Sequence, residues 1–144
     1  MASVATDDED ILTQTLDEVR DSLALADSRS PRQALPHLRQ AQLRLTAAID
    51  EAMALAIVEE GTSIRQAGAL AGLSENSVPP RLAMTESLAA YADDSGRVSA
   101  RAAERARYDR ERGIEPPPPL PPAAAAGIAP APRAPMTFRR RRPD

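Results

Sequence analysis

The sequence predicts an all-α protein, and three observations lead to that fold class. Hydrophobic residues make up 42% of the chain, whereas aromatic residues make up only 2%. A core must therefore be built from Leu, Ile, Val and Ala, whose small side chains suit close-packed helices better than a sheet. Apolar residues recur at spacings of three and four, and residues that cap helices stand before most of these segments.

A first helix is expected from Thr6 onward, because Thr6 and Glu9 have the spacing of a capping box. Apolar residues then follow at alternating spacings of four and three, which is the pattern of a heptad seam. The seam is too short for an isolated coiled coil, so it must pair with another helix in this chain or in a second copy. It consists of Leu12, Leu16, Val19, Leu23 and Ala26.

A second helix is expected to begin between Pro31 and Pro36, since proline is tolerated in a first turn. It is expected to run to Glu60 and to stop at Gly61. With the first helix it forms either an antiparallel hairpin or a dimer seam. Its apolar positions fall in two neighbouring rows, Leu38, Leu45 and Ala52 in one and Gln42, Ile49 and Ala56 in the other.

A third helix is expected next, because Thr62 or Ser63 can cap it. Gly72 provides the turn that follows, and Ser74 can cap a second short helix that contains Val78. The apolar stripe of the third helix consists of Ile64, Ala67, Leu70 and Ala71.

The proline pair that follows allows a second interpretation. Pro79 or Pro80 can open a new helix, since a first turn does not need the amide that proline lacks. Ser77 is then the cap, and the helix runs from Arg81 to about Tyr91. Such a helix would bury Leu82 and Leu88, together with Met84 and Tyr91.

Residues 93–96 have the composition of a turn, and Ser99 can cap a last helix that ends near Arg112. The surface of this helix carries many charges of both signs. Its apolar face is thin, so we expect it to dock loosely or to project. That face consists of Val98, Ala102 and Ala106.

Residues 63–82 outline a helix-turn-helix, the unit whose second helix usually enters the DNA major groove. Such a unit needs a small residue where its helices cross and a glycine in its turn, and Gly68 and Gly72 supply them. The proline pair departs from the pattern, because it ends the recognition helix after about one turn. The positions expected to face inward are Leu73, Val78 and Leu82.

The segment Ile-Arg-Gln-Ala-Gly-Ala-Leu-Ala-Gly-Leu-Ser, residues 64–74, resembles the helix-turn-helix of bacterial transcriptional regulators and sigma-factor DNA-binding modules. Together with the helix before it, the segment is similar to small actinobacterial proteins of this kind. The resemblance covers roughly residues 45–91, and it implies duplex DNA as the partner.

By position, the resemblance places Glu75, Asn76 and Ser77 at base edges, and Arg65 and Arg81 at phosphates. Asn can pair with adenine, and Glu can accept a hydrogen bond from cytosine. The two arginines of the motif are balanced by two glutamates, whereas strong duplex binders usually supply several cations. A dimer would double each contact and partly offset this weak charge.

Four divisions of the chain follow. The first 27 residues carry a net charge of −7, and residues 116–144 carry +4. The last division is rich in proline and alanine, which favours a disordered tail. The divisions are an acidic N-terminal association region (1–60), the helix-turn-helix (61–92), a charged helix (93–115) and the tail (116–144).

The tail ends in a basic cluster, which could bind nucleic-acid phosphate or an acidic protein surface. The open alternative is a solvated end without a partner. The cluster consists of Arg139, Arg140, Arg141 and Arg142.

Several classes of function lack their usual signals. The chain has no Cys and one His, His37, which stands without other ligands at metal-binding spacing, so no metal site or cofactor is expected. No nucleophile, base and orienting group lie together in a motif, and an enzyme is not expected. The chain has no long apolar run and begins with an acidic segment, so a cytoplasmic protein without membrane contact is expected.

The sequence thus predicts a DNA-binding protein that dimerises through its N-terminal helices, as a small transcriptional regulator or as a plasmid or phage accessory factor. The alternative is a non-enzymatic interaction or assembly protein. In that case the heptad faces bind another helical protein, the tail docks onto an acidic partner, and the helix-turn-helix is purely structural.

Overall fold

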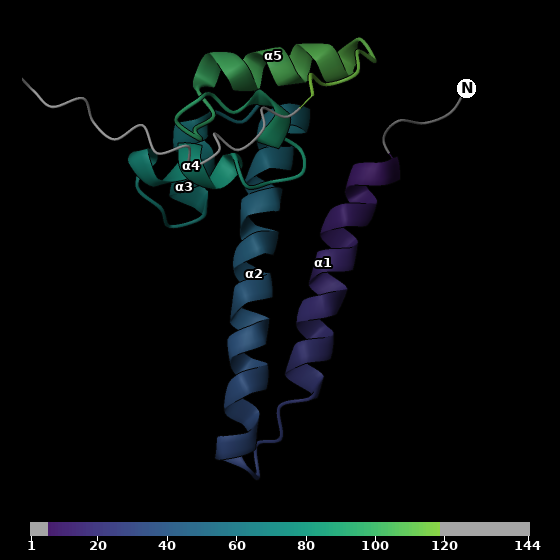
Figure 1. Ribbon diagram of the computed structural model, residues 1–144, viewed down its shortest axis with the longest axis vertical. Coiled ribbons are helices and arrows are strands. Elements are labelled where there is room, and N and C mark those ends of the chain that lie inside the picture. The colour runs from purple at the N-terminus through teal and green to yellow at the C-terminus, as the bar shows by residue number, and fades with distance from the viewer. Residues whose placement is uncertain (1–5, 119–144) are drawn as a thin grey trace, which may run out of the picture.

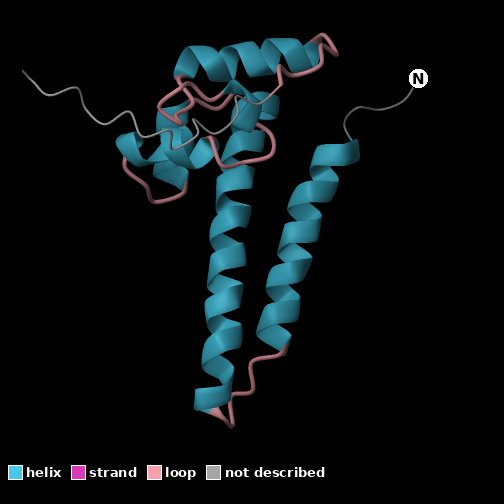
Figure 2. Ribbon diagram, in the orientation of Figure 1, coloured by secondary structure: helices cyan, strands magenta, loops and turns pink. Residues whose placement is uncertain are grey.

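The protein is described by a computed structural model over residues 6–118, with backbone alone for residues 6–10. All regular structure in this part is helical, as the sequence predicted (Figure 2). Two long antiparallel helices form a hairpin, and short helices gather around the end of the second one (Figure 1). The elements in order are α1 (Thr6–Ala24), α2 (Pro31–Glu60), α3 (Ile64–Leu70), the 3₁₀ turn η1 (Glu75–Ser77), α4 (Val78–Leu82), the 3₁₀ turn η2 (Ala89–Tyr91) and α5 (Ala100–Glu111).

Helix α2 begins and ends where the sequence predicts. Pro31 occupies its first turn, and Pro36 lies one turn further on inside the helix. Gly61 adopts the left-handed conformation with φ of 70°, and its N–H donates to the carbonyl of Ala56. This closes the last turn, because a residue without Cβ can reverse the chain there at low cost. Helix α1 begins at Thr6, but the side chains of its predicted capping box lie outside the described part.

The seam between α1 and α2 is lined by alanines. Ala34, Ala41 and Ala48 stand seven residues apart on α2 and are 5%, 4% and 2% exposed. The leucines of the rows named from the sequence do not line this contact, because Leu38 and Leu45 remain 44% and 45% exposed. A helix period of 3.6 residues cannot tell which of two adjacent rows faces the neighbouring helix. On α1, Val19 and Ser22 are buried, whereas Leu16 and Leu23 of the predicted seam are exposed.

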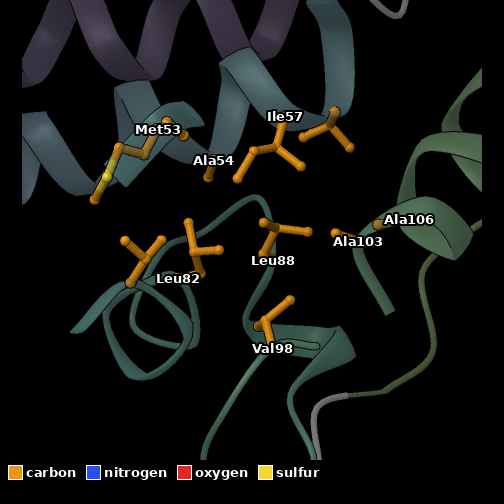
Figure 3. Close-up of a cluster of buried hydrophobic side chains, with 11 residues drawn as sticks. Met53, Ala54, Ile57, Leu82, Leu88, Val98, Ala103 and Ala106 are labelled. Carbon is orange, nitrogen blue, oxygen red and sulfur yellow. The ribbon is translucent and has the colours of Figure 1, made fainter. Parts of the chain in front are cut away.

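The part of the molecule from Met53 to Glu111, here called the head, has one hydrophobic core (Figure 3). Its largest fully buried side chains are Leu82, Leu88, Val78 and Val98. The last turns of α2 supply one wall of this core, and α5 supplies another. The predicted divisions at residues 60/61 and 92/93 therefore do not separate independent cores. The cluster consists of Met53, Ala54, Ile57, Val58, Ala67, Val78, Leu82, Leu88, Val98, Ala103 and Ala106.

The chain leaves helical geometry soon after Leu82, so the helix predicted from Arg81 to about Tyr91 was wrong. The carboxylate of Glu51, on α2, accepts hydrogen bonds from the backbone N–H groups of Glu86 and Ser87. A continuing helix would have bonded these same two groups to its own carbonyls. Met84, which that helix would have buried, is instead 84% exposed.

Helix α5 packs closely against the rest of the head, whereas its sequence led us to expect that it docks loosely or projects. Ala103 and Ala106 are each 3% exposed, and their small size lets α5 approach the core closely. Two polar contacts add to this packing: the hydroxyl of Tyr91 donates to Asp109 over 3.1 Å, and the guanidinium of Arg110 contacts Glu59 at 2.6 Å. The cap predicted at Ser99 is present, with its hydroxyl accepting from the N–H of Ala102.

Candidate nucleic-acid interface

The two short helices α3 and α4 cross in close contact. A Cβ placed on Gly68 would lie 2.7 Å from a methyl carbon of Val78, closer than real side chains approach. Glycine is therefore the one residue type at position 68 that allows this crossing without a shift of Val78. Val78 is itself fully buried. The turn between the helices uses Gly72 at φ of 69°, and the N–H of Leu73 donates to the carbonyl of Gly68. The glycines that the sequence singled out thus stand at the crossing and in the turn.

The segment after this turn is exposed at its start and buried at its end. Ser74 does not cap the following turn as predicted, because its hydroxyl bonds the hydroxyl of Ser77. Glu75 and Asn76 are exposed on η1, while Val78 and Leu82 point into the core. The proline pair lies in the first turn of α4, where no amide partner is needed. The backbone therefore stays helical from η1 into α4, although α4 itself is short.

Arg81, one of the two predicted phosphate contacts, is engaged within the fold. Its Nε lies 2.7 Å from Oδ1 of Asp50, and the side chains are 28% and 14% exposed. A partly buried pair of this kind is less screened by solvent than a surface pair. Asp50 and Glu51 are neighbours on α2, and together they hold the segment from Arg81 to Ser87 against that helix. Sequence analysis missed both contacts.

Arg97 lies beside the candidate interface, although the sequence did not single it out. Its guanidinium donates to the backbone carbonyl of Asn76 over 3.2 Å. The turn that carries it is organised by Asp93, which accepts hydrogen bonds from the Ser95 hydroxyl and the Arg97 N–H. These hydrogen bonds lower the pKa of Asp93 below its ordinary value, that from Ser95 being the larger cause. The turn thereby brings the guanidinium of Arg97 next to the backbone of Asn76.

The remaining predicted DNA contacts are Arg65 and the basic cluster at the end of the chain. Arg65 is exposed on α3 and has no ion-pair partner within residues 11–118. The described surface of α3, η1 and the turn that carries Arg97 therefore offers the cations Arg65 and Arg97 and the anions Glu75, Asp93 and Asp94. The basic cluster, Arg139 to Arg142, lies outside the described residues.

Comparison with protein-family models, with curated proteins and with solved structures finds no match for the chain. The described part contains no group of three or more His, Cys, Asp and Glu side chains placed to hold a metal ion. Over residues 6–118, none of the helices combines the length and apolar character needed to cross a bilayer.

Proposed function

We propose that the protein binds duplex DNA through the segment formed by α3, η1 and α4, used as a helix-turn-helix. The observation that carries the proposal is the crossing at Gly68, which fixes α3 against the following segment while Asn76 stays exposed at its start. In helix-turn-helix proteins the N-terminal residues of the second helix contact base edges. The role is that of a small transcriptional regulator or of a plasmid or phage accessory factor.

Each residue of this interface has a distinct role in the proposal. Asn76 reads a base edge by paired hydrogen bonds, which suit adenine, and Ser77 makes a permissive contact beside it. Glu75 accepts from cytosine and repels phosphate, which keeps nonspecific affinity low. Arg65 and Arg97 neutralise phosphates, and Arg97 takes the role that the sequence assigned to Arg81.

Titration of the full chain with labelled duplex DNA over a range of salt concentrations tests this proposal. Replacing Arg65 with Ala is expected to weaken binding to all sequences and to reduce the salt slope by about one unit, because one phosphate contact is lost. Arg32→Ala is the matched control, since Arg32 is also exposed but lies at the far end of the hairpin. Equal effects of the two substitutions would contradict the proposal.

A selection from a pool of randomised duplexes tests base recognition separately. Asn76→Ala is expected to relax the preference at one base position, by the roughly 1–3 kcal/mol that a paired contact contributes. A chain ending at residue 115 should keep that preference while binding more weakly. Binding that needs only residues 116–144 and shows no sequence preference would assign DNA contact to the tail instead.

The alternative function, a non-enzymatic assembly protein, is favoured by one observation. The hairpin leaves several leucines about half exposed, which a solitary soluble hairpin does not require. In this alternative neither the α3–α4 segment nor the basic cluster binds duplex DNA. The titration described above therefore distinguishes the two functions.

A further inference from the structure

The hairpin has one apolar side and one polar side. Leu38 and Leu45 stand four residues after Ala34 and Ala41, so they lie about 40° from the alanine seam. Arg44 stands three residues after Ala41, about 60° away in the other direction. There Arg44 donates to the carbonyl of Glu18 and to the hydroxyl of Ser22, which makes that side polar.

Exposed large apolar residues gather on the first side from both helices. On α1, Leu16 and Leu23 lie on the same side of the seam as the leucine row of α2. Both are exposed. We call this surface the leucine face. Its apolar members are Leu16, Leu23, Leu35, Leu38, Leu45 and Ile49, which are 37%, 49%, 64%, 44%, 45% and 38% exposed. Gln42, which is exposed and accepts a hydrogen bond from Arg39, is the polar member of the same surface.

Side-chain size changes along α2 on this face. Toward the hairpin tip the face carries leucines, whereas toward the head the same two rows carry Ala52 and Ala56. A hollow of ≈ 420 Å³ opens beside these alanines and is lined by Ile49, Met53 and Leu70, among other apolar residues. Leu70, which the sequence placed in the apolar stripe of α3, is exposed and lines this hollow. Projections at one end of the face thus accompany a depression at the other.

We propose that the leucine face binds a second copy of this chain, with the two α2 helices antiparallel. Reversing α2 about a twofold axis beside Leu45 sets Leu38 of one copy opposite Ala52 of the other. It sets Leu35 opposite position 55, one residue from Ala56. Each pair forms twice, as a twofold interface requires. The projections of each copy then fill the hollow of the other, and four helices enclose one layer that is apolar apart from Gln42.

The area of the face agrees with such a dimer. The hairpin overlaps α1 with α2 over about 30 Å of length and is two helices wide, about 20 Å. The buried footprint is therefore about 600 Å² on each copy, at the lower end of the range for specific interfaces. A parallel pairing would set leucines against leucines at the tip and leave the two hollows facing each other empty.

The mass of the full chain in solution, measured without DNA, tests the dimer independently of the proposed function. Leu38→Glu is expected to convert the dimer to a monomer, because each copy would bury an unpaired carboxylate. Leu43→Glu is the matched control and should stay dimeric. Leu43 is on the same helix and is 48% exposed, but it lies away from the leucine face. Helix content measured by circular dichroism shows whether each variant is folded.

Cysteine cross-linking tests the direction of pairing, and the absence of native cysteine makes each result specific. Leu45→Cys is expected to form a disulfide between copies rapidly, since it lies beside the axis. Leu38→Cys is expected to cross-link to an Ala52→Cys chain but not to itself.

A monomeric full chain would overturn the proposal, as would a dimer that survives Leu38→Glu. Self-cross-linking by Leu38→Cys would overturn the antiparallel arrangement, because it requires parallel helices. A dimer lost on removal of residues 119–144 would also overturn it, because the contact would then belong to the tail.

Discussion

The hairpin and the head use the same helix in opposite ways. In the head, the large side chains of α2 face a core in which Leu82 and Leu88 are fully buried. In the hairpin, alanines face the partner helix and leucines face outward. Since burial of apolar surface is the main stabilising term in folding, the head is stabilised from within. The hairpin retains apolar surface that no other part of residues 11–118 buries.

The largest expected effect comes from shortening a side chain in the head. Leu82→Ala should lower the free energy of unfolding by about 3 kcal/mol, because it leaves a cavity in a core that cannot readily collapse. Leu35→Ala, the matched change on the leucine face, should cost less than about 0.5 kcal/mol in a dilute monomeric sample. Urea denaturation measures both values.

Repeating that measurement at high protein concentration sharpens the comparison. There the Leu35→Ala variant should become less stable than the unmodified chain, because dimerisation adds stability that depends on concentration. Equal losses from the two substitutions in dilute solution would contradict the distinction between head and hairpin.

A smaller effect is expected from Glu51, whose buried carboxylate accepts from two backbone N–H groups and from the hydroxyl of Ser87. Glu51→Gln should cost about 2 kcal/mol, because an amide has one acceptor oxygen and turns its NH₂ toward a donor. Hydrogen exchange at the amides of Glu86 and Ser87 should speed up as well. Glu60→Gln, at an exposed position of the same helix, is the control, and unchanged exchange in Glu51→Gln would refute the assignment.

The smallest expected effect concerns the hydrogen bond from the hydroxyl of Tyr91, in η2, to the carboxylate of Asp109, in α5. Burial raises the pKa of Tyr91, and its hydrogen bond to Asp109 and the charge of that carboxylate raise it further. The unfolded chain therefore releases the phenolic proton more easily. The contribution to stability is complete below pH about 10 and declines as the pH rises from there through the folded pKa.

Tyr91→Phe should remove this alkaline decline and cost about 1 kcal/mol near neutral pH, the usual value of one hydrogen bond. Unfolding measured at a series of pH values, with phenolate absorbance as a second signal, checks both effects. Tyr108→Phe changes an exposed ring and serves as the control. An alkaline decline that persists in Tyr91→Phe would assign it to another group.

Features set by neighbouring residues were predictable from the sequence. The bounds of α2 follow from Pro31 and Gly61, and the cap of α5 follows from Ser99. The glycine of the turn after α3 was predicted at Gly72, which has φ of 69°. In each case the cause lies within a few positions of the effect.

Features set by residues distant in sequence were not predictable. Glu51 binds the backbone N–H of Glu86 from 35 positions away, and Asp50 pairs with Arg81 across 31. Helical periodicity also could not show that α1 packs on the alanine row of α2, because the adjacent leucine row fits the same period. At the candidate site, the exposed positions of η1 were predicted, whereas the engagement of Arg81 and the proximity of Arg97 were not.

The crossing at Gly68 has a consequence for any chain that descends from this one. A methyl group at position 68 fits only when Val78 shifts or gives up the methyl carbon that would lie 2.7 Å away. We therefore expect correlated substitutions at positions 68 and 78, in which a larger side chain at one accompanies a smaller side chain at the other. Such compensated substitutions, once related chains are aligned, would trace the inheritance of this helix crossing without any measurement of binding.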